Sequence, residues 1–381
     1  MLPEKECVGC FACKSICPVK CIDEIQTEEG FFYPKINTLQ CIKCKKCESV
    51  CPVLKPKGTT LDDGVLPLAF GAMSTDSEIR RNSSSGGLFA EIARYILSQG
   101  GVVYGTAFYN DQCQIERITT VDELPRLQGS KYIQNRTNDS YLSVGRDLEA
   151  NRKVLFVGTP CQVAGLLNCF DRRYSNLITI DVVCHGVGSP KALSAYLYEL
   201  GKRKHSAIRS LSFRDKSTGW KNYSVSVKFE DGSFERTTFN ENQFMKAYLA
   251  NLCLRPSCHN CHFKTISRRS DITLADYWGL QKSHPEYDDD LGCSFVLLHS
   301  NVGKEIFSAI ASNLIYFNAE SEDLVRYNSA CVRSVAPHHF REYFFSKLGK
   351  GSFTKLVSDC LHPSFSVRLQ RKAGALLNRK S

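Results

Sequence analysis

The sequence predicts a small, cysteine-rich domain followed by a mixed body of helices and strands, of the α+β or α/β class. Eight of the 19 cysteines form two matching runs within the first 51 residues. Beyond residue 66, segments with helical apolar spacing alternate with apolar segments typical of strands. With 381 residues, the chain is long enough for two or three domains.

Composition and charge narrow the class of function. Apolar residues make up 43% of the chain and charged residues 23%, as in ordinary globular proteins. The formal net charge of +10 treats every cysteine as neutral, and metal-bound thiolates would lower it. Because the basic residues are scattered before the tail, we predict no nucleic-acid binding. No apolar signal core or membrane-spanning run is visible, so we expect a cytoplasmic protein without a transmembrane segment, in which cysteine clusters bind metal.

The N-terminal cysteines form an internal duplication. Each run has the spacing C-x2-C-x2-C-x3-C followed by proline, and the second run lies 34 residues after the first. This is the bacterial ferredoxin pattern, in which three thiolates of one run bind one 4Fe–4S cluster and the fourth binds the other. Residues 1–57 are therefore predicted to hold two clusters, one on Cys7, Cys10, Cys13 and Cys51, the other on Cys41, Cys44, Cys47 and Cys17. Cys21 lies outside the pattern, and we expect it to pack rather than bind.

The body is predicted to begin after a linker at residues 58–66. An amphipathic helix is expected at 88–98 and a strand at 102–108. The run Ser83–Gly87 precedes this helix, so its backbone N–H groups could hold a phosphate, although a simple serine cap is the alternative. Further elements are a strand, a Gly-Thr-Pro turn and a helix at 153–167, a strand at 177–186, a helix at 189–205 and a β-hairpin at 223–239.

These elements suggest a body in two parts, 67–150 and 151–310, followed by a helical, basic extension at 311–381. The tail from 361 onward has five basic residues and no acidic one. Such a helix could make weak contact with a membrane surface or an acidic partner, but a solvated terminal helix is the simpler reading.

A second group of cysteines predicts another metal site. Cys253, Cys258 and Cys261 have the spacing C-x4-C-x2-C, which is similar to the plant ferredoxin pattern and needs a distant fourth ligand. Zinc bound by three cysteines and one histidine remains an alternative. Cys184 is the preferred fourth ligand because it follows an apolar strand, where ligands gather in open α/β sheets. The other candidates are Cys293, Cys331, His259 and His262.

Seven motifs occur in order along the body, and together they carry a resemblance. They are SSSGG (83–87), GSKYIQ (129–134), GTPCQ (158–162), CHG (184–186), FRDK (213–216), RPSCHNC (255–261) and DITLADYWG (271–279). Over roughly residues 66–310 the chain resembles the coenzyme F-420 hydrogenase/dehydrogenase beta-subunit family of iron–sulfur flavoproteins, with a two-cluster ferredoxin-type domain in front. It also resembles the 7-hydroxymethyl chlorophyll a reductase branch.

The resemblance implies FAD and a 4Fe–4S cluster inside the flavin-binding body. It makes Cys184, Cys253, Cys258 and Cys261 the ligands of that cluster. The residues expected around the flavin are Ser85, Gly86, Gly87, Lys131, Thr159 and Gln162.

Catalytic roles are expected for three side chains of these motifs. The thiol of Cys161 could touch flavin or substrate, or be a buried spectator. His185 could relay a proton or only shape the cluster pocket. Lys131 could stabilise a flavin anion or the pyrophosphate, or be a surface lysine. Arg214, Asp276 and Trp278 are expected to support the site from outside it.

The resulting hypothesis is an FAD- and iron–sulfur-dependent oxidoreductase. Ferredoxin or another redox protein would exchange electrons with the clusters, and FAD would exchange two with a small-molecule substrate. That substrate is either a deazaflavin, coenzyme F-420, or an intermediate of a polysaccharide pathway. One alternative is an electron-transfer subunit that feeds a partner enzyme and has no substrate site. Another is a binding scaffold stabilised by zinc and clusters, without flavin.

Overall fold

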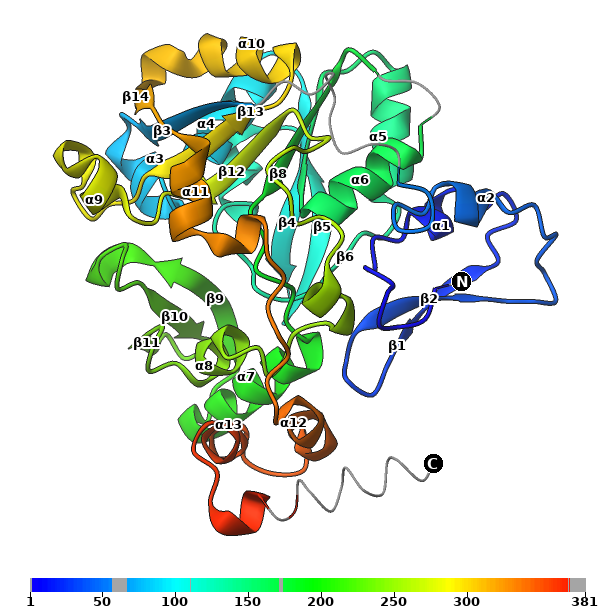
Figure 1. Ribbon diagram of the computed structural model, residues 1–381, viewed down its shortest axis with the longest axis vertical. Coiled ribbons are helices and arrows are strands. Elements are labelled where there is room, and N and C mark those ends of the chain that lie inside the picture. Colours follow the sequence, from blue (N-terminus) through cyan, green and yellow to red (C-terminus); the bar gives the residue numbers. More distant parts are fainter. Residues whose placement is uncertain (1, 57–66, 110, 171–173, 369, 371–381) are drawn as a thin grey trace.

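The computed structural model describes residues 2–56, 67–109, 111–170, 174–368 and 370. A small N-terminal module protrudes on one side of a larger body (Figure 1). The linker predicted at 58–66 and the end of the basic tail, residues 371–381, lie outside the described residues.

The N-terminal module repeats its local structure as it repeats its cysteines. Helices α1 (Ala12–Ser15) and α2 (Lys46–Ser49) both start after a residue in the left-handed region, Phe11 with φ 57° and Lys45 with φ 59°. These two residues are 34 positions apart, the same separation as the cysteine runs. Between the helices, β1 (Ile22–Gln26) pairs antiparallel with β2 (Phe32–Ile36).

A nine-stranded mixed sheet forms the centre of the body. Four neighbouring strands, β4, β7, β8 and β12, run parallel, and antiparallel strands extend the sheet on both sides. In sheet order the strands are β14 (Leu314–Asn318), β3 (Leu68–Ser74), β13 (Ser294–Leu298), β12 (Ile272–Asp276), β8 (Leu177–Val182), β7 (Val154–Gly158), β4 (Val102–Tyr109), β5 (Gln112–Ile118) and β6 (Asn135–Arg136).

Helices cover both faces of this sheet, which explains why most side chains of its central strands are apolar and buried. On one face, α4 (Leu88–Ser98) and α10 (Asn301–Ile310) pack on residues such as Leu155. On the other face, α5 (Ser140–Glu149) and α6 (Pro160–Asn168) pack on neighbours such as Val154. Figure 1 shows α10 and the α5–α6 pair at different ends of the sheet. The predicted helix at 88–98 and the strand beginning at 102 are confirmed.

A second layer of the body contains a three-stranded sheet and the helices packed on it. The strands of this sheet are β9 (Ile208–Asp215), β10 (Ser224–Phe229) and β11 (Phe234–Thr238). The predicted hairpin is confirmed, because β10 and β11 pair antiparallel around Gly232 with φ 84°. The predicted helix is α7 (Pro190–Lys204), and Ser189 caps it by accepting a hydrogen bond from Ala192 N. The other helices of this layer are α8 (Gln243–Leu249), α12 (Arg341–Lys347) and α13 (Phe353–Leu361).

The segment after residue 310 differs from the helical extension expected for it. Strand β14 pairs with β3 and forms an edge of the central sheet. Helices α11 (Ser321–Tyr327), α12 and α13 follow. No helix among the described residues is long and apolar enough to cross a membrane.

Two short helices and six 3-10 turns complete the described structure. They are α3 (Ser77–Asn82), α9 (Leu280–Ser283) and six 3-10 turns at Val121–Arg126, Lys216–Thr218, Pro256–Asn260, Pro285–Tyr287, Ala311–Asn313 and Ser329–Cys331.

Candidate iron–sulfur and cofactor site

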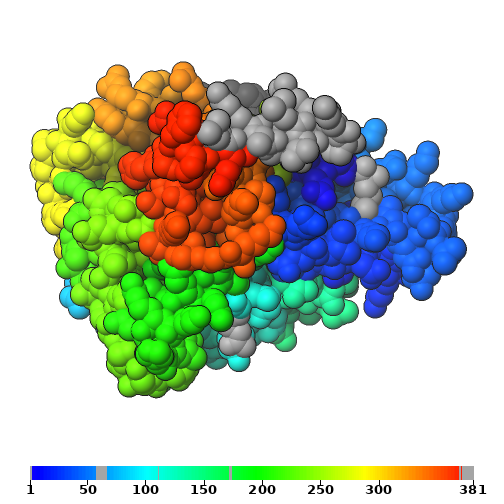
Figure 2. Space-filling view, turned by 90° about the horizontal axis from the view of Figure 1, so that it is seen from below, coloured from blue at the N-terminus to red at the C-terminus, as the bar shows by residue number. Residues whose placement is uncertain are grey.

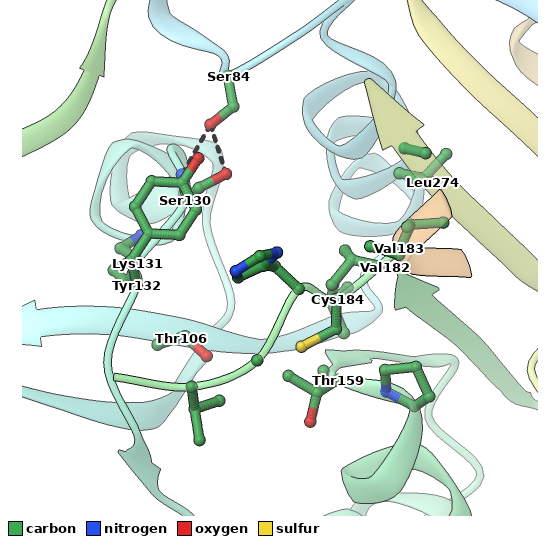
Figure 3. A pocket seen from close by; sticks show the side chains of 18 of the residues that line it. Ser84, Thr106, Ser130, Lys131, Tyr132, Thr159, Val182, Val183, Cys184 and Leu274 are labelled. Atoms are coloured by element: carbon green, nitrogen blue, oxygen red, sulfur yellow. Dashed lines mark hydrogen bonds between the residues drawn. The ribbon is translucent and has the colours of Figure 1, made fainter. Parts of the chain in front are cut away.

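A cavity of about 470 Å³ lies at the carboxyl ends of β7, β8 and β12. This is the edge of an open α/β sheet where ligands are usually bound. Its lining includes residues of all seven motifs noted in the sequence, together with Val8 and Gly9 of the N-terminal module. Figure 3 shows Ser84 and Ser130 on one side of the cavity, with Cys184 and Thr159 on the other.

Four cysteines line this cavity, and we call them the cavity thiols: Cys161, Cys184, Cys258 and Cys261. Cys161 lies in the first turn of α6, and Cys184 follows the end of β8. Cys258 lies in the 3-10 turn Pro256–Asn260, where its Sγ accepts a hydrogen bond from Val187 N at 3.4 Å. The position of a Cβ atom at Gly186 would be 3.2 Å from the Cβ of Cys258, so glycine allows the two loops to approach.

The electrostatics of the cavity thiols agree with this proximity. Burial is the largest cause that raises the pKa of Cys184 and of Cys258, and the thiolate charge of Cys261 raises both further. Lys264 acts in the opposite direction and lowers the pKa of Cys184, whose carbonyl oxygen accepts a hydrogen bond from the Lys264 ammonium. A 4Fe–4S cluster carries negative charge, and this lysine is placed to offset it.

The donor set fits a cluster better than a single ion. Among the described residues, no three Cys, His, Asp or Glu side chains lie close enough together to hold one metal ion. Thiolates that bind a 4Fe–4S cluster contact separate iron atoms and therefore lie further apart. His259, one of the alternative ligands, does not line the cavity. Its Nδ1 is 2.9 Å from the carbonyl oxygen of Val335, and its buried Nε2 has no hydrogen-bond partner among the described residues.

Cys253 does not join the other three cysteines of its predicted ligand set. Its side chain is fully buried in the apolar core beneath α7 and α8, and it does not line the cavity. Burial raises the pKa of the Cys253 thiol to about 12. The structure therefore places Cys253 in the core, apart from the other three cysteines of the expected ligand set, whereas Cys161 lines the cavity with them.

The N-terminal cysteines gather in the two expected groups. We call Cys7, Cys10, Cys13 and Cys51 the inner set, and Cys17, Cys41, Cys44 and Cys47 the outer set. Burial raises the pKa of Cys13 to about 12, and the charges of Cys7 and Cys51 contribute, so these thiols are close. The outer set lines a small surface pocket together with Cys21, whose Sγ is 3.5 Å from that of Cys17.

The inner set lies against the body of the protein. A Cβ atom at Gly165 of α6 would be 2.9 Å from Cys10 Sγ, so the thiol touches the helix backbone. Arg255, which is fully buried, donates from Nε to Cys7 O at 3.0 Å and from Nη1 to Phe32 O at 3.1 Å. Two reciprocal hydrogen bonds join the Gln134 amide to the backbone of Phe32. The inner set is thus held next to the cavity.

The serine–glycine run before α4 serves close packing at least in part. A Cβ atom at Gly86 would be 2.3 Å from Ala72 O, and Gly87 has φ 94° as the N-cap of α4. The Ser85 hydroxyl donates to Cys293 O at 2.6 Å and points at the sheet. Ser84, which was not among the expected flavin contacts, accepts from Ser130 N and Oγ at the cavity wall, as Figure 3 shows.

Lys131 lines the cavity, as expected for a residue near the flavin, but backbone groups hold its ammonium. Its ammonium donates to the carbonyl oxygens of Leu127 at 2.9 Å and Gln128 at 2.7 Å. Burial lowers its pKa to about 8. The side chain therefore fixes the loop that borders the cavity, while its positive end is occupied by backbone.

Thr159 and Gln162 form a capping box at the start of α6. Thr159 N donates to Gln162 Oε1 at 3.1 Å, and the Gln162 amide nitrogen donates to the side chain of Asn135. These contacts fix the first turn of α6, including Cys161. His185 also lines the cavity, with its Nε2 2.8 Å from Asn251 Oδ1, and burial is the main cause that lowers its pKa.

Arg214 and Asp276 both line the cavity and form its charged end. They therefore lie closer to the site than the outside position expected for them. Arg214 Nη1 is 3.1 Å from Asp276 Oδ2, and its guanidinium lies 4.1 Å from the ring centre of Tyr223. Trp278 lines the cavity beside this pair and stacks on Trp220, with ring centres 4.7 Å apart. The motifs FRDK and DITLADYWG were the available signals for this group.

Two parts of the chain match models of known protein families. Residues 151–323 match the family model that describes the C terminus of the coenzyme F420 hydrogenase/dehydrogenase beta subunit. Residues 6–54 match the model of a 4Fe-4S dicluster domain. None of the curated proteins matches the chain. Among solved structures, it is similar to the F420-reducing NiFe hydrogenase complex from Methanosarcina barkeri, with 18% identity and a TM-score of 0.47 over 79% of this chain and 91% of that chain.

The two family models cover the two regions that hold the clustered cysteines, and they confirm the resemblance derived from the motifs. Residues 6–54 therefore form a 4Fe–4S dicluster domain, and residues 151–323 match the C-terminal domain of the beta subunit of coenzyme F420 hydrogenase/dehydrogenase.

Proposed function

We propose that this protein is an iron–sulfur flavoprotein that passes electrons between its 4Fe–4S clusters and a two-electron small-molecule substrate through FAD. One observation carries the proposal. A single cavity at the ligand-binding edge of the central sheet is lined by four thiols and by Val8 and Gly9 of the dicluster module. Cluster chemistry and a space for an organic cofactor thus meet in one place.

The cavity has properties that suit a flavin. Its volume of about 470 Å³ lies within the range typical of cofactor sites, roughly 300–1,000 Å³. The backbone before α4 borders it at Ser83–Ser85 and Gly87, and α4 is long enough for its N-terminus to favour an anion. Arg214 presents a buried Nε without a hydrogen-bond partner among the described residues. When bound, FAD would supply the conversion between one-electron and two-electron transfer that a cluster cannot perform.

The positions of the two cysteine sets support an electron path that runs between the surface of the module and the cavity. The outer set includes the exposed Cys44, whereas Cys10 of the inner set is buried against α6. A ferredoxin or another redox protein would exchange electrons at the outer set, and the inner set would connect to the cavity. Exposed Lys43, Lys45 and Lys46, together with Ile42, surround the outer set and favour an acidic partner with an apolar contact.

The first candidate substrate is a deazaflavin such as coenzyme F-420, which the description of the matching family names. The second candidate substrate is an intermediate of a polysaccharide pathway. The alternative function is an electron-transfer subunit that feeds a partner enzyme without a substrate site of its own. The large cavity next to the thiols favours a substrate- or cofactor-binding protein over that alternative.

Anaerobic purification with iron, sulfide and flavin analysis tests the proposal. We expect about twelve irons and one FAD per chain, since each cluster contains four irons. Adding candidate two-electron compounds should then bleach or restore the flavin absorbance, and the compound that does so identifies the substrate class. Iron without flavin, or flavin that no small molecule reduces or oxidises while a partner protein does, would favour the electron-transfer subunit.

A further inference from the structure

We infer that the buried guanidinium of Arg255 raises the reduction potential of the cluster held by the inner set, because it supplies a positive charge that has no acidic partner among the described residues. Arg255 thereby tunes electron transfer, in addition to joining the dicluster module to the body. The inference requires the inner cluster but neither FAD nor a substrate, so it is tested apart from the proposed function.

Arg255 differs from the other buried arginines in lacking a carboxylate partner. It is fully buried, yet none of the ion pairs among the described residues includes it. The three other buried arginines in that part of the chain each pair with a carboxylate: Arg80 with Asp289, Arg214 with Asp276 and Arg268 with Asp181. Burying an unpaired charge is costly, so Arg255 requires a negative partner that the described side chains do not supply.

The groups around the guanidinium compensate its charge only in part. Its Nε donates to Cys7 O at 3.0 Å, its Nη1 donates to Phe32 O at 3.1 Å, and its Cζ lies 3.9 Å from the ring centre of Tyr33. Carbonyl oxygens and ring faces carry a partial negative charge rather than a full one. The remaining nitrogen, Nη2, is buried and has no hydrogen-bond partner among the described residues. A 4Fe–4S cluster bound by four thiolates is an anion with sulfur acceptors, and it would supply what this cation lacks.

Arg255 lies between the inner set and the cavity thiols. A Cβ atom at Gly9 would be 2.9 Å from its Cζ and 3.0 Å from its Nη1, so the guanidinium packs on the segment that joins Cys7 to Cys10 of the inner set. In the other direction, Cys258 N donates to Arg255 O at 3.0 Å, within the turn that carries Cys258 to the cavity. The positive charge is therefore held next to the inner set, on its side toward the body.

A positive charge at this position favours the reduced form of the inner cluster. Reduction adds one electron, and hence one negative charge, and opposite charges attract more strongly in a protein interior than in water. The lysines around the outer set are exposed, so water and salt screen their charges, whereas Arg255 is shielded from both. The inner cluster should therefore have a higher reduction potential than it would have without Arg255, which favours electron transfer inward from the outer set.

Three variants measure the contribution of this charge. Arg255→Gln removes the charge, Arg255→Lys keeps it, and the control Lys5→Gln removes an exposed charge two residues before Cys7. Each protein is purified anaerobically, and its clusters are titrated with a reductant while their electron paramagnetic resonance is recorded. The signal that is lost in Cys13→Ser identifies the inner cluster, because Cys13 belongs to the inner set alone.

We expect Arg255→Gln to lower the reduction potential of the inner cluster by at least a tenfold change in the reduction equilibrium, which is about 59 mV for a one-electron couple. Arg255→Lys should show less than about half of that shift, and Lys5→Gln should leave the potential unchanged. Both substitutions at residue 255 remove the planar hydrogen-bonding fork, so a purely structural role predicts equal shifts in the two variants. Equal shifts, an unchanged potential in Arg255→Gln, or a shift of the same size in Lys5→Gln would overturn the inference.

A second measurement covers the case in which Arg255→Gln does not assemble the inner cluster. Iron per chain then falls by about four, the content of one cluster. Retention of that iron in Arg255→Lys would show that the cluster requires the buried charge, which supports the inference. The same loss of iron in Arg255→Lys would show that the hydrogen bonds of the arginine hold the cluster, which overturns it.

Discussion

Cys10 of the dicluster module lies against Gly165 of helix α6, so closely that a Cβ atom at position 165 would be 2.9 Å from the Cys10 sulfur and 3.1 Å from its Cβ. Real Cβ atoms do not approach backbone-anchored neighbours so closely, and Cys10 is itself fixed by its place in the module. The absence of a side chain at residue 165 is what allows the inner set to dock on the body.

Gly165→Ala should therefore disturb the docking of the module. Alanine favours a helix interior over glycine by about 1 kcal/mol, so a substitution without steric effect would stabilise α6. Here the added methyl group displaces Cys10, and we expect a lower melting temperature and incomplete iron in the inner cluster. Thermal unfolding and iron analysis of the anaerobic protein measure both.

Gly145→Ala is the matched control for this substitution. Gly145 lies within helix α5, and a Cβ atom there would meet only Phe170 Cε1 at 3.5 Å, an ordinary contact. The control should keep its iron and unfold at the same or a higher temperature. Equal behaviour of the two variants would mean that Cys10 has room to move.

Arg255 holds the same interface from the other side. It is fully buried, it donates to Cys7 O and Phe32 O, and its guanidinium lies 3.9 Å from the ring centre of Tyr33. Arg255→Lys keeps the charge but cannot make both hydrogen bonds with the planar stacking contact. The substitution should lower the free energy that holds the module on the body by about 2 kcal/mol, a typical value for hydrogen bonds to charged groups. Amide exchange around residues 7–13 should therefore be roughly thirtyfold faster.

Hydrogen exchange measured by mass spectrometry tests this prediction. The exposed Arg209, changed to lysine, serves as the control and should leave exchange in the module unchanged. If Arg255→Lys also exchanges at the rate of the unchanged protein, the arginine contributes nothing to the interface.

Several elements were predictable because local sequence determined them. The apolar spacing at 88–98 and the glycines that follow it define α4 and the start of β4. Ser189 and Pro190 mark the start of α7 for a similar local reason. The duplicated cysteine runs also predicted which thiols gather in the module, because the spacing itself encodes the two-cluster arrangement.

The fourth thiol at the cavity could not be predicted in this way. Spacing along the chain says nothing about the direction in which Cys253 points, and that direction depends on a bridge between Leu254 and Gly188, residues far apart in sequence. The orientation of Lys131 likewise depends on the path of the loop at residues 127–128. Strand β14 is short and lies at an edge, so its assignment depends on pairing with β3.

His299 should make the folded protein sensitive to acid. Burial and, to a smaller extent, the charge of Arg268 lower the pKa of His299 to about 3, and its Nε2 is 2.8 Å from Thr273 Oγ1. The backbone N–H of His299 donates to the carbonyl oxygen of Asp271, and the Thr273 hydroxyl donates to the Asp181 carboxylate. Because the folded-state pKa lies below the unfolded value of about 6.5, the unfolded chain binds more protons between these values.

The stability that depends on neutral His299 is therefore fully present above about pH 6.5 and decreases as the pH falls toward 3. His299→Gln keeps a hydrogen-bond donor for Thr273 but cannot be protonated in this range. Melting temperatures measured from pH 7.5 to 5.5 should fall more steeply for the unchanged protein than for the variant. Parallel curves would show that His299 does not contribute to the acid response.

The lysines around the outer set should control the rate of electron exchange with a redox partner. Lys43, Lys45 and Lys46 are exposed beside Cys44, which is itself exposed. Seen from below, the module that carries them protrudes from the side of the molecule (Figure 2). Changing all three to glutamate should slow reduction by an acidic ferredoxin at least tenfold at low salt, because long-range attraction increases association rates by roughly 10 to 1,000 times.

Stopped-flow reduction at several ionic strengths tests the lysine prediction. For the unchanged protein the rate should fall as salt is added, whereas for the triple variant it should stay level or rise, because salt then screens a repulsion. A variant with Lys202, Lys228 and Lys304 changed to glutamate carries the same change in net charge at exposed positions on α7, β10 and α10. If this control slows as much as the module variant, overall charge rather than the surface at the outer set governs the encounter.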